Sequence, residues 1–185
     1  MSGQKIAFTP DQVTRLERIL SQENRIRDLA LWLLGKDTSL RSIDLLSLTL
    51  ADVCWSGGIK ETLSIKQRKT GRYVKCTLSE ATRSIMAAYV LSLSAKSVAA
   101  NARLFPITTR HYRRLVKEWC EFLRMDGTHY STHSVRRTVP THIYRHTKDL
   151  VACQILLGHA SPAATVRYIN MGEQEAHELK AQFPI

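Results

Sequence analysis

The sequence lacks the features shared by disulfide-bonded, zinc-stabilised and membrane-spanning proteins. Its four cysteines contain no C-x-x-C pair and are widely spaced, at Cys54, Cys76, Cys120 and Cys153. This pattern argues against a disulfide framework or a zinc site and indicates small buried side chains in a reducing compartment. The N-terminus has no apolar signal-peptide core, and no apolar run is long enough to span a bilayer. We therefore expect a cytoplasmic protein without a membrane partner.

Internal repeats, low-complexity segments and Pro- or Gly-rich linkers are also missing, so no domain boundary is evident. The chain has 185 residues, of which 44% are hydrophobic, and this suffices for a core without disulfides or metals. We expect a single domain over residues 1–185, with a flexible arm at residues 1–8 and a C-terminal tail at residues 172–185.

Positive charge, by contrast, is abundant. Lysine and arginine total 27 against 16 aspartate and glutamate residues, which gives a net charge of +11. The isoelectric point is about 9.8. Such an excess favours a polyanionic partner, with nucleic acid ranked before an anionic membrane surface. A basic surface without a specific partner is the alternative.

Helical periodicity dominates the chain. Thr9-Pro10 predicts the start of one helix, and a second is expected at residues 23–34, ended by Gly35. Further helices are expected at residues 39–48, 79–93, 110–125, from Thr132 onward, 149–157 and 162–168. Short strands are expected at residues 53–55, 62–66 and 72–78, separated by Gly57-Gly58 and Thr70-Gly71 turns. The predicted fold is mainly α with a small three-stranded antiparallel β-meander, an α+β domain.

Two predicted surfaces concentrate positive charge, and we expect both to contact DNA phosphates. Their members are Lys66, Arg68, Arg72 and Lys75 on the meander, and Arg110, Arg113 and Arg114 on the helix at residues 110–125. Lysines also commonly blunt exposed strand edges, and a basic helix face can simply meet water. A solvated surface is therefore the alternative for both.

The segment from Thr132 to Tyr168 holds groups that phosphodiester cleavage without a metal needs. It contains His133 and Arg136 three residues apart, then Gly158-His159, then Tyr168. Arginine binds two phosphate oxygens through its planar fork. Histidine moves protons near neutral pH. A tyrosine phenol can attack phosphorus as it is deprotonated. Each residue alone has an ordinary structural explanation, but the ordered combination is more specific.

Five short motifs carry the catalytic candidates in a fixed order. They are LRSIDLLSLTLADV with Arg41, RKTGR with Lys69, HSVRRT with His133 and Arg136, LLGHAS with His159, and TVRYI with Tyr168. In this order and spacing the chain, from about Phe8 to Phe183, resembles the catalytic domain of the tyrosine recombinases, or phage integrases. Its shortness is similar to that of the fimbrial-switch invertases in that family.

The resemblance implies how the scissile phosphate is bound. Arg41 and Arg136 would clamp its oxygens, and His133 and His159 would hydrogen-bond it and assist proton transfer. Asp44 resembles the family's acidic residue that orients these groups.

The resemblance also implies the chemistry itself. Lys69, on a mobile turn, would protonate the leaving 5′ oxygen while Tyr168 attacks and forms a 3′-phosphotyrosyl link. A 5′ hydroxyl from a second strand then reverses the step. The bond energy is conserved in the phosphotyrosine, so neither ATP nor a metal nor any other cofactor is expected.

Partners and location follow from the same resemblance. We expect double-stranded DNA, a homo-oligomer of two to four chains on that DNA, and a bacterial or phage-encoded protein associated with the nucleoid. The tail at residues 172–185 would dock on a neighbouring protomer or pack on its own domain.

Three departures from the family pattern stand out. Ser39 occupies a position where the family usually has glycine, and Pro140 interrupts the helix that carries Arg136. A proline inside a helix removes one hydrogen bond and costs roughly 3 kcal/mol. The N-terminal core-binding domain of most members has no counterpart here, so a short member, a truncated protein and an accessory partner that supplies the DNA clamp all stay open.

Three functions are therefore compared. The first is a site-specific recombinase that integrates, excises or inverts a DNA element. The second is a DNA-binding accessory protein that keeps the fold without cleaving alone, and the third is relaxation of supercoils in the manner of a type IB topoisomerase.

The pair His142 and His146 has a spacing that can hold zinc, but no third ligand is evident and no metal site is predicted.

Overall fold

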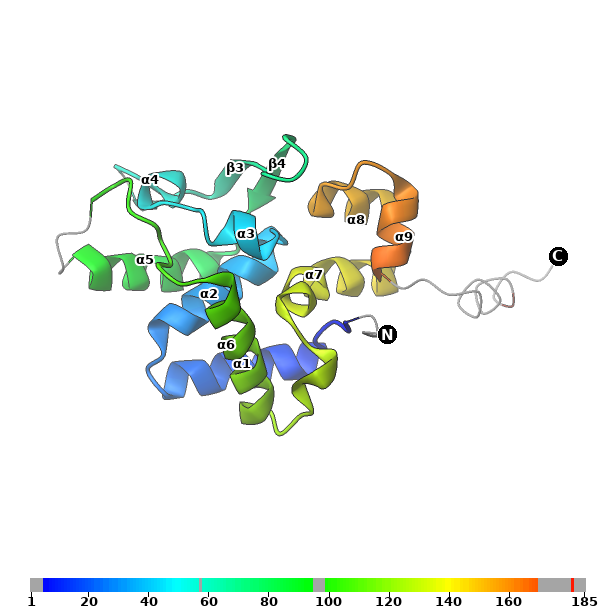
Figure 1. Ribbon diagram of the computed structural model, residues 1–185, viewed down its shortest axis with the longest axis horizontal. Helices are drawn as coiled ribbons and strands as arrows, with labels where there is room; N and C mark the ends of the chain where they lie inside the picture. The colour runs from blue at the N-terminus through cyan, green and yellow to red at the C-terminus, as the bar shows by residue number, and fades with distance from the viewer. Residues whose placement is uncertain (1–4, 57, 95–98, 170–180, 182–185) are drawn as a thin grey trace.

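The computed structural model describes residues 5–56, 58–94, 99–169 and 181, and most of its regular structure is helical (Figure 1). The helices are α1 (Pro10–Gln22), α2 (Ile26–Thr38), α3 (Ser42–Leu45), α4 (Leu50–Val53), α5 (Glu80–Ser94), α6 (Thr109–Phe122), the 3-10 helix η1 (Gly127–His129), α7 (Thr132–Thr147), α8 (Leu150–Leu157) and α9 (Pro162–Ile169). The strands are β1 (Cys54–Trp55), β2 (Gly58–Ile59), β3 (Thr62–Lys66) and β4 (Tyr73–Thr77). The predicted tail at residues 172–185 lies outside the described residues, except for Ala181.

Side chains cap several helices where the sequence predicts it. Thr9 forms a capping box with Gln12 ahead of α1, and Pro10 takes the first helical position. Asp149 accepts a hydrogen bond from Ala152 N at 2.8 Å and starts α8. The cap of α7 is Ser131 rather than the predicted Thr132. Ser131 and Asp149 thus set where α7 and α8 begin.

One large cluster of buried apolar side chains, the main core, joins α1, α2, α5, α6, the first turns of α7 and the β3–β4 hairpin. The indoles of Trp32 and Trp119 are fully buried and meet edge to face, with ring centroids 5.7 Å apart. Tyr112 packs on Trp119 at 6.0 Å between centroids. Ring burial of this kind contributes large apolar areas plus roughly 0.5–1.5 kcal/mol per ring pair.

The prediction that Gly35 ends α2 is wrong, because the helix continues to Thr38. A Cβ at Gly35 would lie 3.0 Å from Tyr112 Oη and 3.2 Å from Val135 Cγ1. The glycine therefore permits close approach of α6 and α7 to α2. The helix ends instead at Ser39, whose left-handed backbone (φ 49°) favours glycine and costs a serine about 1–2 kcal/mol.

The helix predicted at residues 39–48 shrinks to the four residues of α3. Arg41 precedes it with an extended backbone, φ −65° and ψ 149°. Ile43, predicted to face inward, is 49% exposed, whereas Leu40, Leu45 and Leu46 are buried as expected. The left-handed turn at Ser39 interrupts the helical register, so the apolar spacing alone misplaced both the start of the helix and one of its faces.

The predicted three-stranded meander is wrong, because the strands form two separate antiparallel pairs. β1 folds back onto β2, with Trp55 opposite Gly58, and β3 pairs with β4 from Thr62–Thr77 to Lys66–Tyr73. Lys60 N donates to Val53 O and its Nζ donates to Ala51 O, which ties the first pair to α4. Among the described strands, β3 and β4 pair only with each other.

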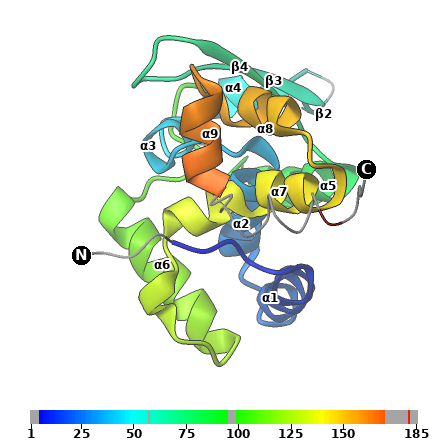
Figure 2. The same cartoon turned by 90° about the vertical axis from the view of Figure 1, so that its right-hand side faces the viewer.

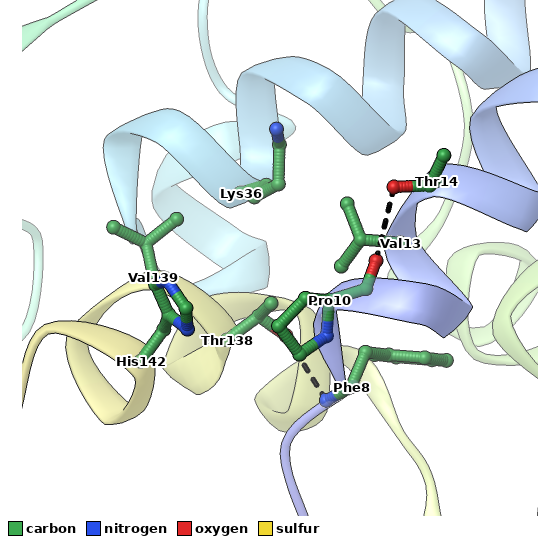
Figure 3. A pocket seen from close by; sticks show the side chains of 8 residues that line it. All are labelled: Phe8, Pro10, Val13, Thr14, Lys36, Thr138, Val139 and His142. Atoms are coloured by element: carbon green, nitrogen blue, oxygen red, sulfur yellow. Dashed lines mark hydrogen bonds between the residues drawn. The ribbon is translucent and has the colours of Figure 1, made fainter. Parts of the chain in front are cut away.

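The N-terminal segment packs on the domain over its described residues. Ile6 N donates to His129 O, Phe8 N donates to the Thr138 hydroxyl at 3.3 Å, and Phe8 is 3% exposed. The predicted flexible arm is thus anchored at residues 5–8, while residues 1–4 lie outside the described part. A hollow of about 230 Å³ lies between the start of α1, Lys36 of α2 and His142 of α7. Figure 3 shows Phe8 among the side chains that line it.

Residues 149–169, which we call the α8–α9 unit, pack on the outer half of α7 through a second, small cluster. Its buried members are Tyr144, Cys153 and Ile169. Cys153 Sγ also donates to Pro140 O at 3.2 Å. Figure 2 shows α8 and α9 on the same side of α7 as the β3–β4 hairpin, with α1 and α6 farther away. Among the described helices, none is long and apolar enough to cross a membrane.

Candidate active site

Five of the six predicted catalytic residues come from four separate segments that converge where α3 and the β3–β4 hairpin face α7, α8 and α9 (Figure 1). Arg41 precedes α3, His133 and Arg136 lie in the first turns of α7, and His159 follows α8. Tyr168 lies on α9. The described contacts link these five residues, and Arg41 reaches Arg136 through Gln67 and the Leu157 carbonyl.

Arg136 is a deeply buried cation of the site, with 2% of its surface exposed. Its Nη2 donates to Leu157 O at 2.7 Å, but Nε and Nη1 have no hydrogen-bond partner. Burial lowers the pKa of Arg136 to about 10, and the neighbouring Arg41 charge acts in the same direction. A buried cation with unused donors is costly by itself and favours an incoming anion.

Pro140 does not break the helix that carries Arg136. The helix runs without a break from Thr132 to Thr147 with Pro140 inside it. The guanidinium of Arg136 is held from the opposite side by the carbonyl of Leu157. Its position therefore depends on the end of α8 as well as on α7.

Arg41 is partly buried and lies across the site from Arg136. Its Nη1 donates to Gln67 Oε1 at 2.7 Å. Asp44, expected to orient the phosphate-binding groups, has no described hydrogen bond or ion pair with Arg41. Asp44 is 1% exposed, its Oδ1 accepts from Arg68 N at 2.9 Å, and its Oδ2 has no hydrogen-bond partner. Asp44 thus fixes the turn that follows β3, and its charge also favours the protonated form of Arg136 and so opposes the fall in pKa.

Both candidate histidines are held in the neutral form. Burial lowers the pKa of His159 to about 4, and the charges of Arg136 and Arg41 add to the effect. Burial and the same arginines also lower the pKa of His133. His159 Nδ1 lies 3.1 Å from the Thr165 hydroxyl, which leaves Nε2 as the ring nitrogen for a substrate. At neutral pH both imidazoles can accept a proton.

Tyr168 lies among these groups. Its hydroxyl donates to His133 O at 3.3 Å, and its ring centroid is 5.2 Å from that of His159. The guanidinium carbon of Arg136 is 5.5 Å from the ring centroid. Burial raises the pKa of the Tyr168 phenol, and the arginine charges oppose that rise. The phenol is therefore protonated at rest and sits where positive charge would stabilise its anion.

Lys69 is the predicted catalytic residue that the described contacts do not join to the other five. It is exposed on the turn between β3 and β4. This turn is tied to the site by Gln67 and Asp44, which contact Arg41 and Arg68 respectively.

Sequence reasoning missed two buried residues of the site, Gln67 and Arg137. Arg137 is 5% exposed, donates to the carbonyl oxygens of Lys5 and Tyr168, and its guanidinium carbon lies 4.6 Å from the Tyr168 ring centroid. Its signal was its position beside Arg136 on α7. Gln67 continues the inward alternation of Leu63 and Ile65 along β3, so a period of two would have placed it inside.

The predicted DNA-contact residues are all exposed. They are Lys66, Arg68, Arg72 and Lys75 on the hairpin and Arg110, Arg113 and Arg114 on α6. Arg72 and Lys75 line an open hollow together with Gly158 and His159, so the basic hairpin leads to the site. The charge of Arg113 contributes to lowering the pKa of His133, which places α6 near it as well. No three His, Cys, Asp or Glu side chains gather as a metal site among the described residues.

Comparisons with known proteins show the family of the chain. A family model described as "Phage integrase family" matches residues 7–175. The chain is 28% identical over 170 residues to "Probable integrase/recombinase YoeC" of Bacillus subtilis (strain 168), which covers 88% of this chain and 87% of that protein. It is 30% identical over 176 residues to the tyrosine recombinase XerC of Pelobacter propionicus, covering 91% of this chain and 56% of that protein.

Solved structures share the fold. XerA recombinase superposes with a TM-score of 0.76 at 21% identity, covering 97% of this chain and 65% of that one. The catalytic domain of bacteriophage HP1 integrase gives a TM-score of 0.61 at 16% identity, covering 97% of this chain and 95% of that one. The chain thus spans nearly all of the HP1 catalytic domain but 24–56% of the XerC and XerD relatives that it matches.

The chain has the fold of recombinase and integrase catalytic domains, and its Tyr168 lies beside the buried Arg136. The chain belongs to the phage integrase family. The resemblance drawn from the sequence motifs is thereby confirmed.

Proposed function

We propose that this chain is a DNA strand transferase that cleaves and rejoins specific sites through a 3′-phosphotyrosyl intermediate. The observation that carries the proposal is the position of Tyr168, whose ring lies beside Arg136 and His159. A phenol held next to a buried arginine with two unpartnered donors is suited to attack on a bound phosphodiester. No group supplied from outside the chain is needed for that step.

In this mechanism Arg41 and Arg136 bind the non-bridging oxygens of the scissile phosphate. Arg136 offers Nε and Nη1, which are buried and unpartnered. Arg41 keeps one contact to Gln67 and has further donors for the phosphate. The two cations offset the negative charge that otherwise repels a nucleophile. One well-placed donor of this kind is worth roughly 2.7–4 kcal/mol of barrier.

The Tyr168 oxygen then bonds to phosphorus as the bond from phosphorus to the 5′ oxygen breaks. The phenol proton passes to a neutral imidazole, His133 or His159, whose low pKa values would rise once the phosphate charge offsets the nearby arginines. Lys69 donates a proton to the leaving 5′ oxygen from its turn. Attack by a 5′ hydroxyl restores the diester and frees Tyr168.

The proposed substrate is double-stranded DNA, bound by the exposed lysine and arginine side chains of the β3–β4 hairpin and α6. The net charge of +11 supports this partner. A related fold, the XerH site-specific recombinase, has been solved bound to its difH substrate, with a TM-score of 0.74 at 20% identity. We further propose that the chain acts as one catalytic domain in a homo-oligomer of two to four copies on DNA, with an accessory clamp protein as a further partner, in the cytoplasm near the nucleoid.

The proposal is tested with nicked duplexes tiled across the DNA that flanks the protein's own coding region. The nick lets the short fragment that carries the freed 5′ hydroxyl diffuse away. Rejoining is then prevented, and the covalent adduct is trapped. Wild type should form an adduct that resists denaturation on at least one duplex, and Tyr168→Phe should form none. DNA binding with a steep salt dependence but no adduct would instead indicate an accessory binder. Relaxation of a plasmid without a specific site would indicate a topoisomerase.

A further inference from the structure

Gln67 is a buried amide at the centre of the site that none of the proposed chemical steps uses. It is 1% exposed and stands at the start of the turn that carries Lys69. Its backbone closes that turn, since its N–H donates to Arg72 O and its carbonyl accepts from Gly71 N, both at 2.8 Å. The side chain is therefore fixed by the hairpin and points toward α8.

The amide of Gln67 joins three segments of the site. Its Oε1 accepts from Arg41 Nη1 at 2.7 Å and from the Thr70 hydroxyl at 3.0 Å. Its Nε2 donates to Leu157 O at 3.4 Å. The same carbonyl accepts from Arg136 Nη2 at 2.7 Å. A chain of hydrogen bonds thus runs from Arg41 through Gln67 and Leu157 to Arg136.

This chain of contacts requires both ends of an amide. One end must accept from Arg41 and Thr70, and the other must donate to a carbonyl. Glutamate would accept at both ends and oppose Leu157 O, and methionine would do neither. Leaving such buried partners unpaired costs about 1–3 kcal/mol each.

Gly158 is shaped around the same side chain. A Cβ at Gly158 would lie 2.6 Å from Gln67 Nε2, and its φ of +61° also favours glycine. His159 follows directly. The position of Gln67 therefore bears on Arg41 and Arg136 by hydrogen bonds and on His159 by close packing.

We propose that Gln67 is a positioning residue that holds Arg41 and Arg136 at the spacing required by one scissile phosphate. The inference rests on the proposed strand-transfer function. It states that a neutral, buried residue contributes to the rate of DNA cleavage. Gln67 itself does not contact the reacting atoms. It acts through the two arginines, and Thr70 supports it by occupying the second lone pair of Oε1.

The test compares single-turnover adduct formation by wild type, Gln67→Met, Gln67→Glu and Thr70→Val on a trapped duplex that wild type cleaves. Gln67→Met should lower the maximal rate on the order of 10²-fold, while the DNA concentration for half-maximal rate stays within about 3-fold. Gln67→Glu should be slower still, because a carboxylate would compete with the phosphate for Arg41. Thr70→Val should lose about 10-fold or less. Gln22→Met, an exposed change at the end of α1, is the matched control and should equal wild type.

A second substrate separates the arginines from Lys69. Replacing the 5′ bridging oxygen with sulfur gives a thiolate leaving group, whose pKa of about 8.5 makes protonation unnecessary. This substrate should restore Lys69→Ala but leave Gln67→Met as slow, relative to wild type, as before. Restoration of Gln67→Met would overturn the inference, because the residue would then act through Lys69.

Two other results would also overturn it. One is a Gln67→Met rate equal to that of wild type. The other is a rate loss matched by a melting temperature so lowered that the variant is partly unfolded under assay conditions, which would mark Gln67 as a merely structural residue. Failure of wild type itself to form an adduct would instead count against the proposed function, so the two failures are distinguishable.

Discussion

The main core and the α8–α9 unit differ in how extensively their apolar side chains are packed, although both contribute residues to one active site. The main core buries Trp32, Trp119 and Tyr112 in direct ring contact. The α8–α9 unit rests on a small cluster and leaves Val151 and Ile155 63% and 68% exposed. Arg41 and the first turns of α7 adjoin the main core, whereas His159 and Tyr168 belong to the lighter unit. We therefore expect the part of the molecule that carries the nucleophile to open at a lower free-energy cost than the part that supports the phosphate-binding cations.

The largest expected effect tests this difference by creating one cavity in each region. Trp119→Ala should lower the free energy of unfolding by about 3–5 kcal/mol, because it empties the main core. Cys153→Ala should cost about 1 kcal/mol and should speed hydrogen exchange mainly in α8 and α9. Denaturant titration and exchange followed by mass spectrometry measure both. Equal losses, or exchange raised uniformly across the chain, would contradict the division into two regions.

A second prediction separates catalysis from stability at Arg136. Arg136→Met should lower the cleavage rate on the order of 10²–10³-fold, because a buried phosphate donor is lost. The free energy of unfolding should stay level or rise, since a buried cation with two unpartnered donors is replaced by an apolar side chain. Adduct kinetics and denaturant titration report the two quantities. A loss of several kcal/mol in stability would mean that Arg136 serves the fold rather than the site.

The third prediction concerns pH and the histidines of the site. The folded pKa of His159, about 4, lies below its ordinary value of 6.5, so the unfolded chain binds this proton first. The contribution of neutral His159 to the free energy of unfolding is therefore fully present above pH 6.5. It is lost as the pH falls toward 4, by on the order of 1–3 kcal/mol. His133 contributes in the same direction. His159→Gln should flatten the slope in a pH series of denaturant titrations, and an unchanged slope would refute the assignment.

The smallest effect is expected at Pro140. Pro140→Ala should change the cleavage rate by less than tenfold, about 1.4 kcal/mol, because Arg136 is held at its guanidinium by Leu157 O. The measurement is the single-turnover rate on the trapped duplex. A gain of a hundredfold would show that the proline limits the placement of Arg136 after all.

The sequence predicted most of the helices and the chemical groups, because both leave local signals. Thr9 caps α1 where a capping side chain was expected, and Gly158 ends α8 in the left-handed conformation. The prediction failed where distant contacts decide the outcome. Gly35 resembles a helix end but lies inside α2 because α6 and α7 approach it closely.

The site divides in the same way. Motif spacing predicted Tyr168 and the arginines as site residues, because their motifs resemble those of a known family. It did not identify Gln67, whose importance lies in contacts with Arg41 and Leu157, 26 and 90 residues away in the chain. Nor did it give the low pKa of His159, which depends first on burial and then on arginines from other segments. Such properties arise only when separate segments are brought together.

The central claim is that one chain assembles a complete site from its two regions. It is tested most directly by mixing Arg136→Met with Tyr168→Phe on a trapped duplex that wild type cleaves. Each variant lacks one half of the site, and the geometry places both halves in the same chain. We predict that the mixture forms no more adduct than either variant alone. Adduct on the Arg136→Met chain in the mixture, at a level approaching that of wild type, would show that Tyr168 acts in a neighbour's site and would contradict the account.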